Sequence, residues 1–315
     1  MANLAASVTP ETRQSPLRSP RPGAILRERW EIIVLSIPAL IVVLALFIYP
    51  FIYGLEMSLH TDPQGGGPRS LDNYIQFFND SSQTDSIWMT AQIALPATLF
   101  NVALSVPLAY AMRRGIRFER FITTLLILPI TLGSVVVAQS MLMYFGPQGW
   151  FNQALLALHL IPRTAPLKLI HNVIGVDIAL FIQGFPFVFL MVLGYMSGIS
   201  PDLERASRML GANAWQTFWR VIFPMTLPGI AIAFCLNFVA NFTVFPSATI
   251  VGEPNRLTRV LAITAYRAFA EQPNPPQGIA IALIMGAIEF VVIAVVLWLR
   301  SQTSRSASLG AGKGA

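Results

Sequence analysis

The chain has 315 residues, of which 54% are hydrophobic and only 11% are charged, and its mean hydropathy is +0.60. Soluble domains carry about 25% charged residues, so this composition excludes an ordinary soluble domain and indicates a helical protein that crosses a membrane several times. The sequence lacks the alternating segments of about ten residues that are typical of membrane β-barrels. The single Cys235 excludes a disulfide or a thiolate metal site within one chain.

Apolar segments along the chain are each long enough to cross a hydrocarbon core of about 30 Å as a helix. We predict six spans, at residues 32–55, 87–112, 121–144, 172–198, 222–245 and 278–299. The predicted fold class is therefore an all-α polytopic membrane protein. The first span is expected to be retained, because it is longer than the apolar stretch of about 7–15 residues in a signal peptide.

The distribution of Lys and Arg predicts how the spans are oriented. Fifteen of the 21 basic residues fall in the N-terminal tail, the loops after the second and fourth spans, and the C-terminal tail. The other loops hold six. The positive-inside rule then places both termini and the 201–221 loop in the cytoplasm. This distribution also accounts for the net charge of +6 without a nucleic acid partner.

Four parts can be distinguished along the chain. Residues 1–30, rich in Ser, Pro and Arg, are expected to form a disordered cytoplasmic tail, and 301–315 a similar C-terminal tail. Residues 31–86 hold the first span and a turn-rich outer loop over 60–86. Residues 87–300 form a core of five spans, with a cytoplasmic loop at 200–221. Within the outer loops, the segments at 150–160 and 257–270 are candidates for short interfacial helices.

A polar segment between the fourth and fifth spans, 201–224, reads PDLERASRMLGANAWQTFWRVIFP. Ser200 is a good N-cap for a short helix that should end near residue 210, and Gly211 can adopt the left-handed conformation of a C-cap. Asn213 can cap a second helix, with Gln216 as its capping-box partner. The segment is therefore predicted to form a helix, a glycine turn and a second helix that enters the membrane.

This segment is similar to the loop, known by its Glu-Ala-Ala motif, through which permeases of binding-protein-dependent ABC importers dock onto their ATPase. The residues that match its two small positions, its glycine and its closing I-x-L-P pattern are Ala206, Ser207, Gly211, Val221, Phe223 and Pro224. The chain departs from the motif at its first position, where Arg205 replaces the Glu and Glu204 lies one residue earlier.

The resemblance covers about residues 87–299 and implies the type I ABC importer permease fold, with the first span as an added helix. It implies a bacterial inner-membrane protein that imports a solute with three kinds of partner: an ATPase dimer, a second permease subunit, expected to be a different chain, and an extracytoplasmic solute-binding protein. The residues that it assigns to ATPase coupling are Leu203, Glu204, Arg205, Ala206, Ser207, Gly211, Phe218 and Pro224.

The chain has no GxxxxGK[ST] motif, so we expect no catalytic residues and no cofactor on it, with ATP and Mg on the partner ATPase. The segments at 146–152 and 251–254, the latter followed by Val260 and Leu261, look more like the spermidine/putrescine branch of this family than its sugar branch. That likeness implies a polyamine or another small cationic or organic solute.

Other functions remain open at this point. A sugar-type permease would use the same mechanism on a different solute. An ion-coupled secondary transporter would be expected to have paired broken helices and an internal repeat. An integral-membrane enzyme or a metal site is disfavoured, because His60, His159 and His171 are scattered without HExxH-like spacing.

Polar residues within the spans are candidates for the solute pathway. Glu289, near the middle of the last span, either lines the pore as an anion suited to a cationic solute or is protonated or bonded to another helix. Asn237 and Asn241 lie one helical turn apart and share a face, from which they either line the pore or bond to another helix. Asp177, near the outer end of the fourth span, is a pathway candidate or an exposed interfacial residue.

Overall fold

The computed structural model describes residues 34, 36–62, 67–115, 119–162 and 166–311. The chain divides into two compact units, Met1–Tyr53 and Gly54–Ala315, and we describe each by itself. The described part of the first unit is helical and includes the π-helix η1 (Leu44–Ile48) and the start of α2 (Tyr49–Ser58). The N-terminal tail expected at residues 1–30 lies outside the described residues.

Six helical stretches among the described residues are long and apolar enough to cross a membrane. They are Ser36–Ser58, Ser81–Arg113, Glu119–Ala157, Val173–Ser197, Ala214–Phe242 and Pro275–Gln302. Each overlaps one predicted span, so the prediction of an all-helical protein with six spans is confirmed.

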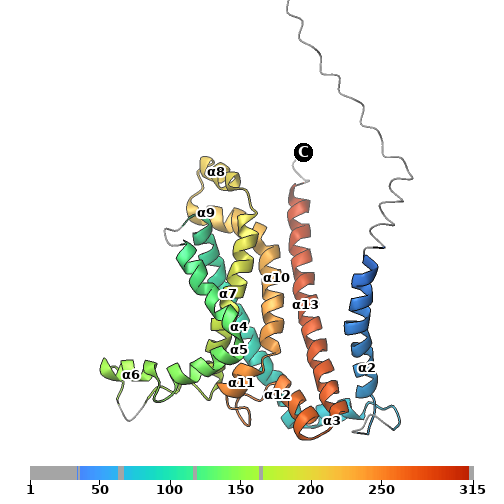
Figure 1. Ribbon diagram of the computed structural model, residues 1–315. Coiled ribbons are helices and arrows are strands. Elements are labelled where there is room, and N and C mark those ends of the chain that lie inside the picture. The colour runs from blue at the N-terminus through green and yellow to red at the C-terminus, as the bar shows by residue number, and fades with distance from the viewer. Residues whose placement is uncertain (1–33, 35, 63–66, 116–118, 163–165, 312–315) are drawn as a thin grey trace, which may run out of the picture. The chain divides into compact units, whose positions relative to one another are not determined.

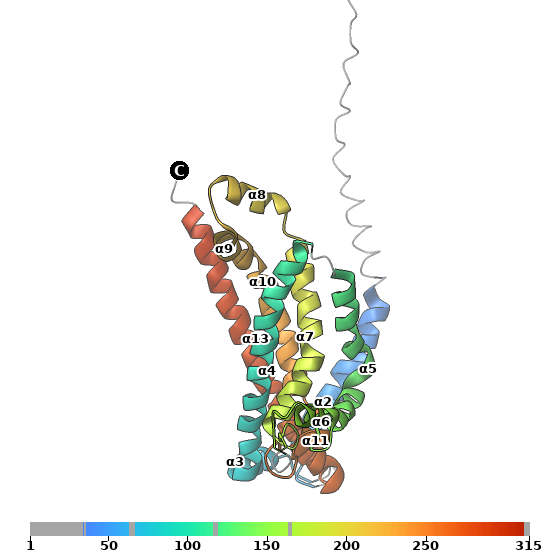
Figure 2. The ribbon, with the colours of Figure 1, turned by 90° about the vertical axis from the view of Figure 1, so that its left-hand side faces the viewer.

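Long helices form the body of the second unit and run side by side (Figures 1 and 2). They are α4 (Ser81–Arg113), α5 (Glu119–Phe145), α7 (Val173–Ser197), α10 (Phe223–Phe242) and α13 (Pro275–Ala311). At one end of the bundle lie α3 (Asp72–Asn79), α6 (Trp150–Ala157), α11 (Pro246–Ile250), α12 (Leu261–Tyr266) and the π-helix η3 (Arg267–Glu271). At the other end lie α8 (Pro201–Met209), α9 (Ala214–Thr217), the π-helix η2 (Phe218–Ile222) and the last residues of α13.

Two segments predicted to be irregular are largely helical. The predicted turn-rich loop over 60–86 contains α3 and the first turns of α4, whose N-cap Asp80 accepts a hydrogen bond from the Ser82 amide at 2.9 Å. The predicted C-terminal tail from residue 301 continues α13 as far as Ala311. Residues 301–311 contain no proline, so no strong helix breaker ends α13 where its apolar stretch ends.

The apolar core of the second unit is centred on α7, which packs against α4, α5 and α10. Towards the α8 end, Val192 and Met196 of α7 are buried together with Met112 of α4 and Ile222 of η2. Towards the other end, α13 packs mainly on α10 and α12 through a second apolar cluster. The α8–α9 loop is therefore attached to a firmly packed part of the bundle.

A cluster of buried polar side chains joins the long helices at mid-depth, and we call Thr98, Asn101, Asn237 and Asn241 the polar node. The side-chain Nδ2 group of Asn101 on α4 donates to Asn237 Oδ1 on α10 at 3.0 Å. The side-chain Nδ2 group of Asn241 on α10 donates to Thr98 Oγ1 on α4 at 3.0 Å. Gly184 of α7 packs closely against this node: a Cβ atom added to Gly184 would lie only 2.3 Å from Asn101 Nδ2. Interhelical hydrogen bonds of this kind contribute about 0.6–2 kcal/mol each within a membrane.

We expect Gly184→Ala to lower the thermal unfolding midpoint of the detergent-solubilised protein by several degrees. The added methyl would also lie 2.7 Å from Asn237 Nδ2, and overpacking of this kind costs about 1–3 kcal/mol. Gly194→Ala is the matched control on the same helix, because nothing lies within 4 Å of its added Cβ. Equal unfolding midpoints for the two variants would contradict the close approach at Gly184.

Candidate functional site

The α8–α9 loop, residues 200–217, has the local structure that its sequence predicts. The Ser200 hydroxyl accepts a hydrogen bond from the Asp202 amide at 3.2 Å, and α8 follows. Gly211 has φ +85°, and its N–H donates to the Arg208 carbonyl at 3.0 Å. Asn213 and Gln216 form a reciprocal capping box at the start of α9. The predicted helix, glycine turn and helix are confirmed.

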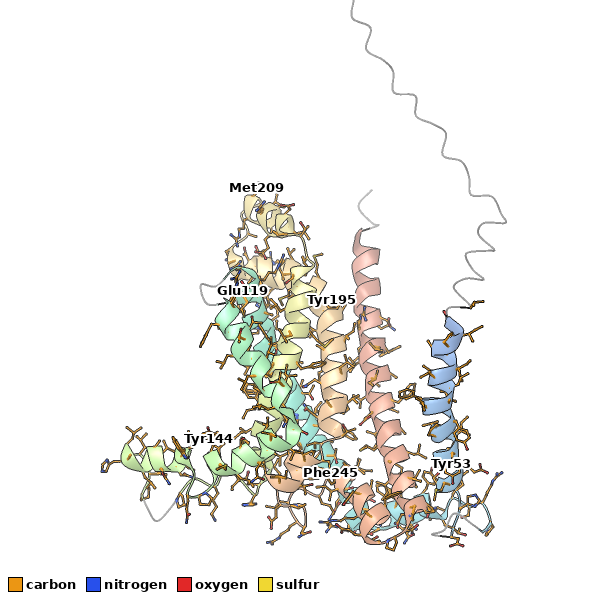
Figure 3. The ribbon with its side chains drawn as sticks, viewed as in Figure 1. Tyr53, Glu119, Tyr144, Tyr195, Met209 and Phe245 are labelled. Carbon is orange, nitrogen blue, oxygen red and sulfur yellow. The ribbon has the colours of Figure 1, made fainter. Side chains whose placement is uncertain are left out.

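The outer face of α8 combines apolar and basic side chains that extend away from the bundle. Met209 is 82% exposed, and Leu210, which caps the helix, is 90% exposed. Figure 3 shows Met209 at the far end of the molecule from Phe245. Leu203, Arg205 and Ala206 are exposed on the same helix. This surface is free to meet another protein.

Other predicted coupling residues attach the loop to the bundle instead. The Ser207 hydroxyl is 3.1 Å from the hydroxyl of Thr217, which is fully buried. Phe218 belongs to the apolar cluster around α7. Pro224 is exposed on α10, inside a span. The eight predicted residues therefore divide between the two faces of α8, the turn at Gly211, the apolar core at Phe218 and the span that holds Pro224.

Glu204 lies on the inner face of α8, accepts a hydrogen bond from Arg113 and forms ion pairs with Arg113, Arg114 and Arg208. Its carboxylate is 2.9 Å from Arg113 Nη1, and 3.6 Å from an Nη2 atom of both Arg114 and Arg208. The side chains of Arg113 and Glu204 are only 8% and 12% exposed. Arg113 also donates to the Ile199 carbonyl at 2.6 Å. A cavity of about 400 Å³ lies beside this cluster.

The structure places the four predicted pathway residues in different surroundings. Asn237 and Asn241 belong to the polar node and bond to α4, which is the interhelical alternative that the sequence left open. Glu289 of α13 has a buried Oε1 atom with no hydrogen-bond partner among the described residues. Asp177 of α7 likewise has a buried Oδ1 atom with no hydrogen-bond partner among the described residues. The two carboxyl groups lie on different helices, although α7 and α13 both pack on α10, and Glu289 is not among the residues that line the groove beside Asp177.

Asp177 faces an open groove of about 280 Å³ between α4 and α7. The other side chains that line it are Pro96, Ala97, Phe100, Ile174, Ile178 and Phe181. The rings of Phe100 and Phe181 have centroids 5.1 Å apart. The groove is thus apolar apart from one carboxyl group.

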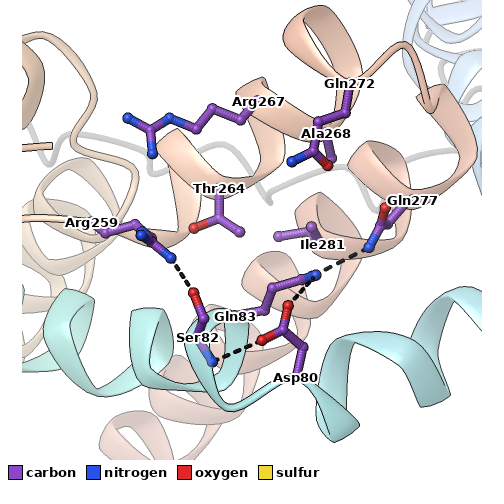
Figure 4. A pocket seen from close by; sticks show the side chains of 10 residues that line it. All are labelled: Asp80, Ser82, Gln83, Arg259, Thr264, Arg267, Ala268, Gln272, Gln277 and Ile281. Atoms are coloured by element: carbon purple, nitrogen blue, oxygen red, sulfur yellow. Dashed lines mark hydrogen bonds between the residues drawn. The ribbon is translucent and has the colours of Figure 1, made fainter. Parts of the chain in front are cut away.

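A polar cavity of about 190 Å³ lies at the opposite end of the bundle from α8 (Figure 4). It is lined by Asp80, Ser82, Gln83, Arg259, Thr264, Arg267, Ala268, Gln272, Gln277 and Ile281. Asp80 accepts from the Gln83 side chain at 3.0 Å, and Arg259 donates to the Ser82 hydroxyl. Its two walls are 177 residues apart in the chain, so sequence reasoning missed this cavity. Within the described ranges, no group of three or more His, Cys, Asp or Glu side chains could hold a metal ion.

Comparison with known proteins supplies a family. The sequence model of the family described as "Binding-protein-dependent transport system inner membrane component" matches residues 101–305. The chain is 26% identical over 212 residues to a probable sulfate transport system permease of Prototheca wickerhamii, covering 67% of this chain and 78% of that one. It is 29% identical over 170 residues to the spermidine/putrescine permease PotB of Haemophilus influenzae, covering 54% and 58%. It is 25% identical over 283 residues to the trehalose permease SugA of Mycobacterium tuberculosis, covering 89% and 90%.

Solved structures share the fold at lower sequence identity. A chain of a bacterial ABC transporter involved in the import of alginate has a TM-score of 0.74 at 18% identity, with 89% of this chain and 98% of that chain covered. A chain of the MetNI methionine ABC transporter has a TM-score of 0.53 at 16% identity, with 71% and 94% covered.

We expect Gly211→Ala to loosen the turn between α8 and α9, because a side chain at φ +85° is strained by about 1 kcal/mol or more. Hydrogen–deuterium exchange should show faster exchange of the amides at Gly211 and Ala212, which bond back to α8. Gly198→Ala is the control, since Gly198 has φ −75° and only an ordinary contact at 3.5 Å for its added Cβ. Unchanged exchange in Gly211→Ala would show that the turn tolerates a side chain.

Proposed function

This chain belongs to the family of binding-protein-dependent transport system inner membrane components, and from that premise we propose how it is oriented, how it is driven and what class of solute it carries. It is a multi-pass permease subunit of an ABC importer and is not itself an enzyme. In our proposal both termini and the α8–α9 loop face the cytoplasm, as the distribution of basic residues indicates.

The proposed docking element is α8, and the observation that carries it is the exposed apolar end formed by Met209 and Leu210. Large apolar side chains grouped on a polar protruding loop mark a surface that a partner covers. An ATPase cleft that receives this end would exclude water from both side chains. Closure of an ATP-bound ATPase dimer would then move α8 as a rigid body, with ATP and Mg held by the ATPase.

The opposite end of the bundle is the proposed outer face, where an extracytoplasmic binding protein would deliver the solute. The polar cavity beside Arg259 opens at this end and offers hydrogen-bonding groups to such a partner. A second permease subunit, which we propose is a different chain, would complete the pathway across the bilayer.

The proposed solute is a small organic cation, such as a polyamine. The supporting observation is that Asp177 and Glu289 each keep a buried carboxyl oxygen without a hydrogen-bond partner among the described residues. Ionisable groups inside spans usually mark pathways for charged solutes. The alternative is a sugar, which is favoured by the trehalose permease that aligns over 89% of this chain. Uptake assays with both solute classes, using the reconstituted importer, distinguish the two.

We expect Leu210→Asp to abolish capture of the partner ATPase during purification in mild detergent, because a carboxylate would replace the most exposed apolar side chain of the docking surface. The unfolding midpoint should stay unchanged, since Leu210 is 90% exposed. Leu257→Asp, at an exposed position near the other end of the bundle, is the control and should capture ATPase normally. Normal capture by Leu210→Asp would count against docking through α8.

We expect Glu289→Gln to reduce uptake of a cationic solute about 30-fold or more, because losing one buried charge partner costs at least about 2 kcal/mol. Uptake should be measured in proteoliposomes that contain the complete importer. Glu271→Gln is the matched control, because it removes the same charge from an exposed position on η3. Equal uptake by wild type and Glu289→Gln would favour a structural role for this carboxyl group.

A further inference from the structure

One ion pair joins the α8–α9 loop to a helix with which it has no direct chain connection. The loop follows α7 and leads into η2 and α10, whereas Arg113 is the last residue of α4. The Arg113 guanidinium donates both to Glu204 of α8 at 2.9 Å and to the carbonyl of Ile199, just after α7, at 2.6 Å. A single side chain thus connects α4, the end of α7 and α8.

The environment of this pair differs from that of the exposed Arg205–Asp202 pair on the same helix. The Arg113 and Glu204 side chains are 8% and 12% exposed, whereas Arg205 and Asp202 are 77% and 79% exposed. An exposed pair is screened by water and contributes little. Breaking a buried pair leaves an uncompensated charge, so such a pair holds its two elements together. Arg114 and Arg208 further neutralise the Glu204 carboxylate at 3.6 Å.

Movement of α4 would be passed to the centre of the bundle. From Arg113, α4 continues without interruption to Asn101 and Thr98, which bond to α10 in the polar node. Pro107 lies within this stretch and removes one backbone hydrogen bond, but the remaining hydrogen bonds of the helix still join Arg113 to Asn101, so that motion at one end reaches the other. The loop is covalently joined to α7 and α10 only, so the Glu204–Arg113 pair gives it a third connection, to α4.

We propose that Glu204 is a positioning residue that transmits motion of α8 to α4 through Arg113, and is not a contact for the ATPase. This inference rests on the proposed docking of α8. It assigns ATPase contact to the outward-facing Leu203, Arg205, Met209 and Leu210 instead, and it gives Arg113, at the far end of the pair, a role in transport that docking alone does not require.

The test compares Glu204→Gln and Arg113→Gln with wild type in the complete importer, reconstituted in proteoliposomes. Three quantities are measured for each protein: ATPase capture, ATP hydrolysis and solute uptake. Glu56→Gln is the control, because it breaks an ion pair with Arg69 that is exposed and lies outside the loop. The double variant Glu204→Gln/Arg113→Gln, which removes both charges together, tests whether the pair itself matters.

We expect both single variants to capture ATPase as wild type does, while uptake per ATP hydrolysed falls about tenfold, within the usual 5–150-fold range of coupling between sites. The double variant should lose no more uptake than either single variant, because each single variant already breaks the same pair. Glu56→Gln should match wild type in every measurement.

Several results would overturn the inference. Loss of ATPase capture in Glu204→Gln but not in Arg113→Gln would make Glu204 a docking contact. Normal uptake per ATP in both variants would show that the pair transmits nothing. If the single variants fail to fold because one buried charge is left unpaired, the double variant decides, since it leaves neither charge of the pair: normal uptake per ATP in the double variant would contradict coupling through the pair. Wild-type protein that captures no ATPase would overturn the proposed function itself, and the inference with it.

Discussion

The hydrogen bonds between α4 and α10 at the polar node are the interaction on which the arrangement of the second unit depends. Lipid tails are as apolar as the Leu and Ile side chains of the spans, so apolar burial cannot by itself choose which helices meet. Buried N–H groups need acceptors, and the Nδ2 group of Asn101 donates to Asn237 Oδ1 of α10. Gly184 lets α7 approach the same point, so three helices are fixed together at mid-depth.

The same helices carry the α8–α9 loop. At the end of the bundle nearest α8, the loop is held by two interactions. Phe218 and Ile222, which follow the loop, pack in the apolar cluster with Val192 and Met196, and Glu204 bonds to Arg113 of α4. On the outer face of α8, the side chains of Met209 and Leu210 remain exposed. The inner face of α8 is attached to the bundle and its outer face is exposed. A partner that pushes on the outer face can therefore move the bundle, because the inner face is held.

Much of the fold could be predicted from the sequence, because a span needs about 20 apolar residues whatever its neighbours are. The caps of α8 and α9 could also be predicted, because Ser200, Gly211 and Asn213 interact with backbone groups only a few residues away. Helix α3 was missed because a short helix outside the membrane needs no apolar run. The direction in which Glu204 points and the partner of Asn237 depend on α4, about 90 and 136 residues away, and no single-sequence pattern reports such contacts.

Docking through α8 is tested most directly by replacing Met209, at the exposed end of α8, with cysteine and identifying what this cysteine contacts. The native Cys235 is buried, so labelling reports Met209→Cys alone. If α8 docks on the cytoplasmic side, a membrane-impermeant maleimide should fail to label this cysteine from outside intact cells, and a short bifunctional crosslinker in inverted vesicles should join it to the ATPase. Labelling from outside, or a lack of crosslinks to an ATPase that is present in the vesicles, would contradict docking through α8.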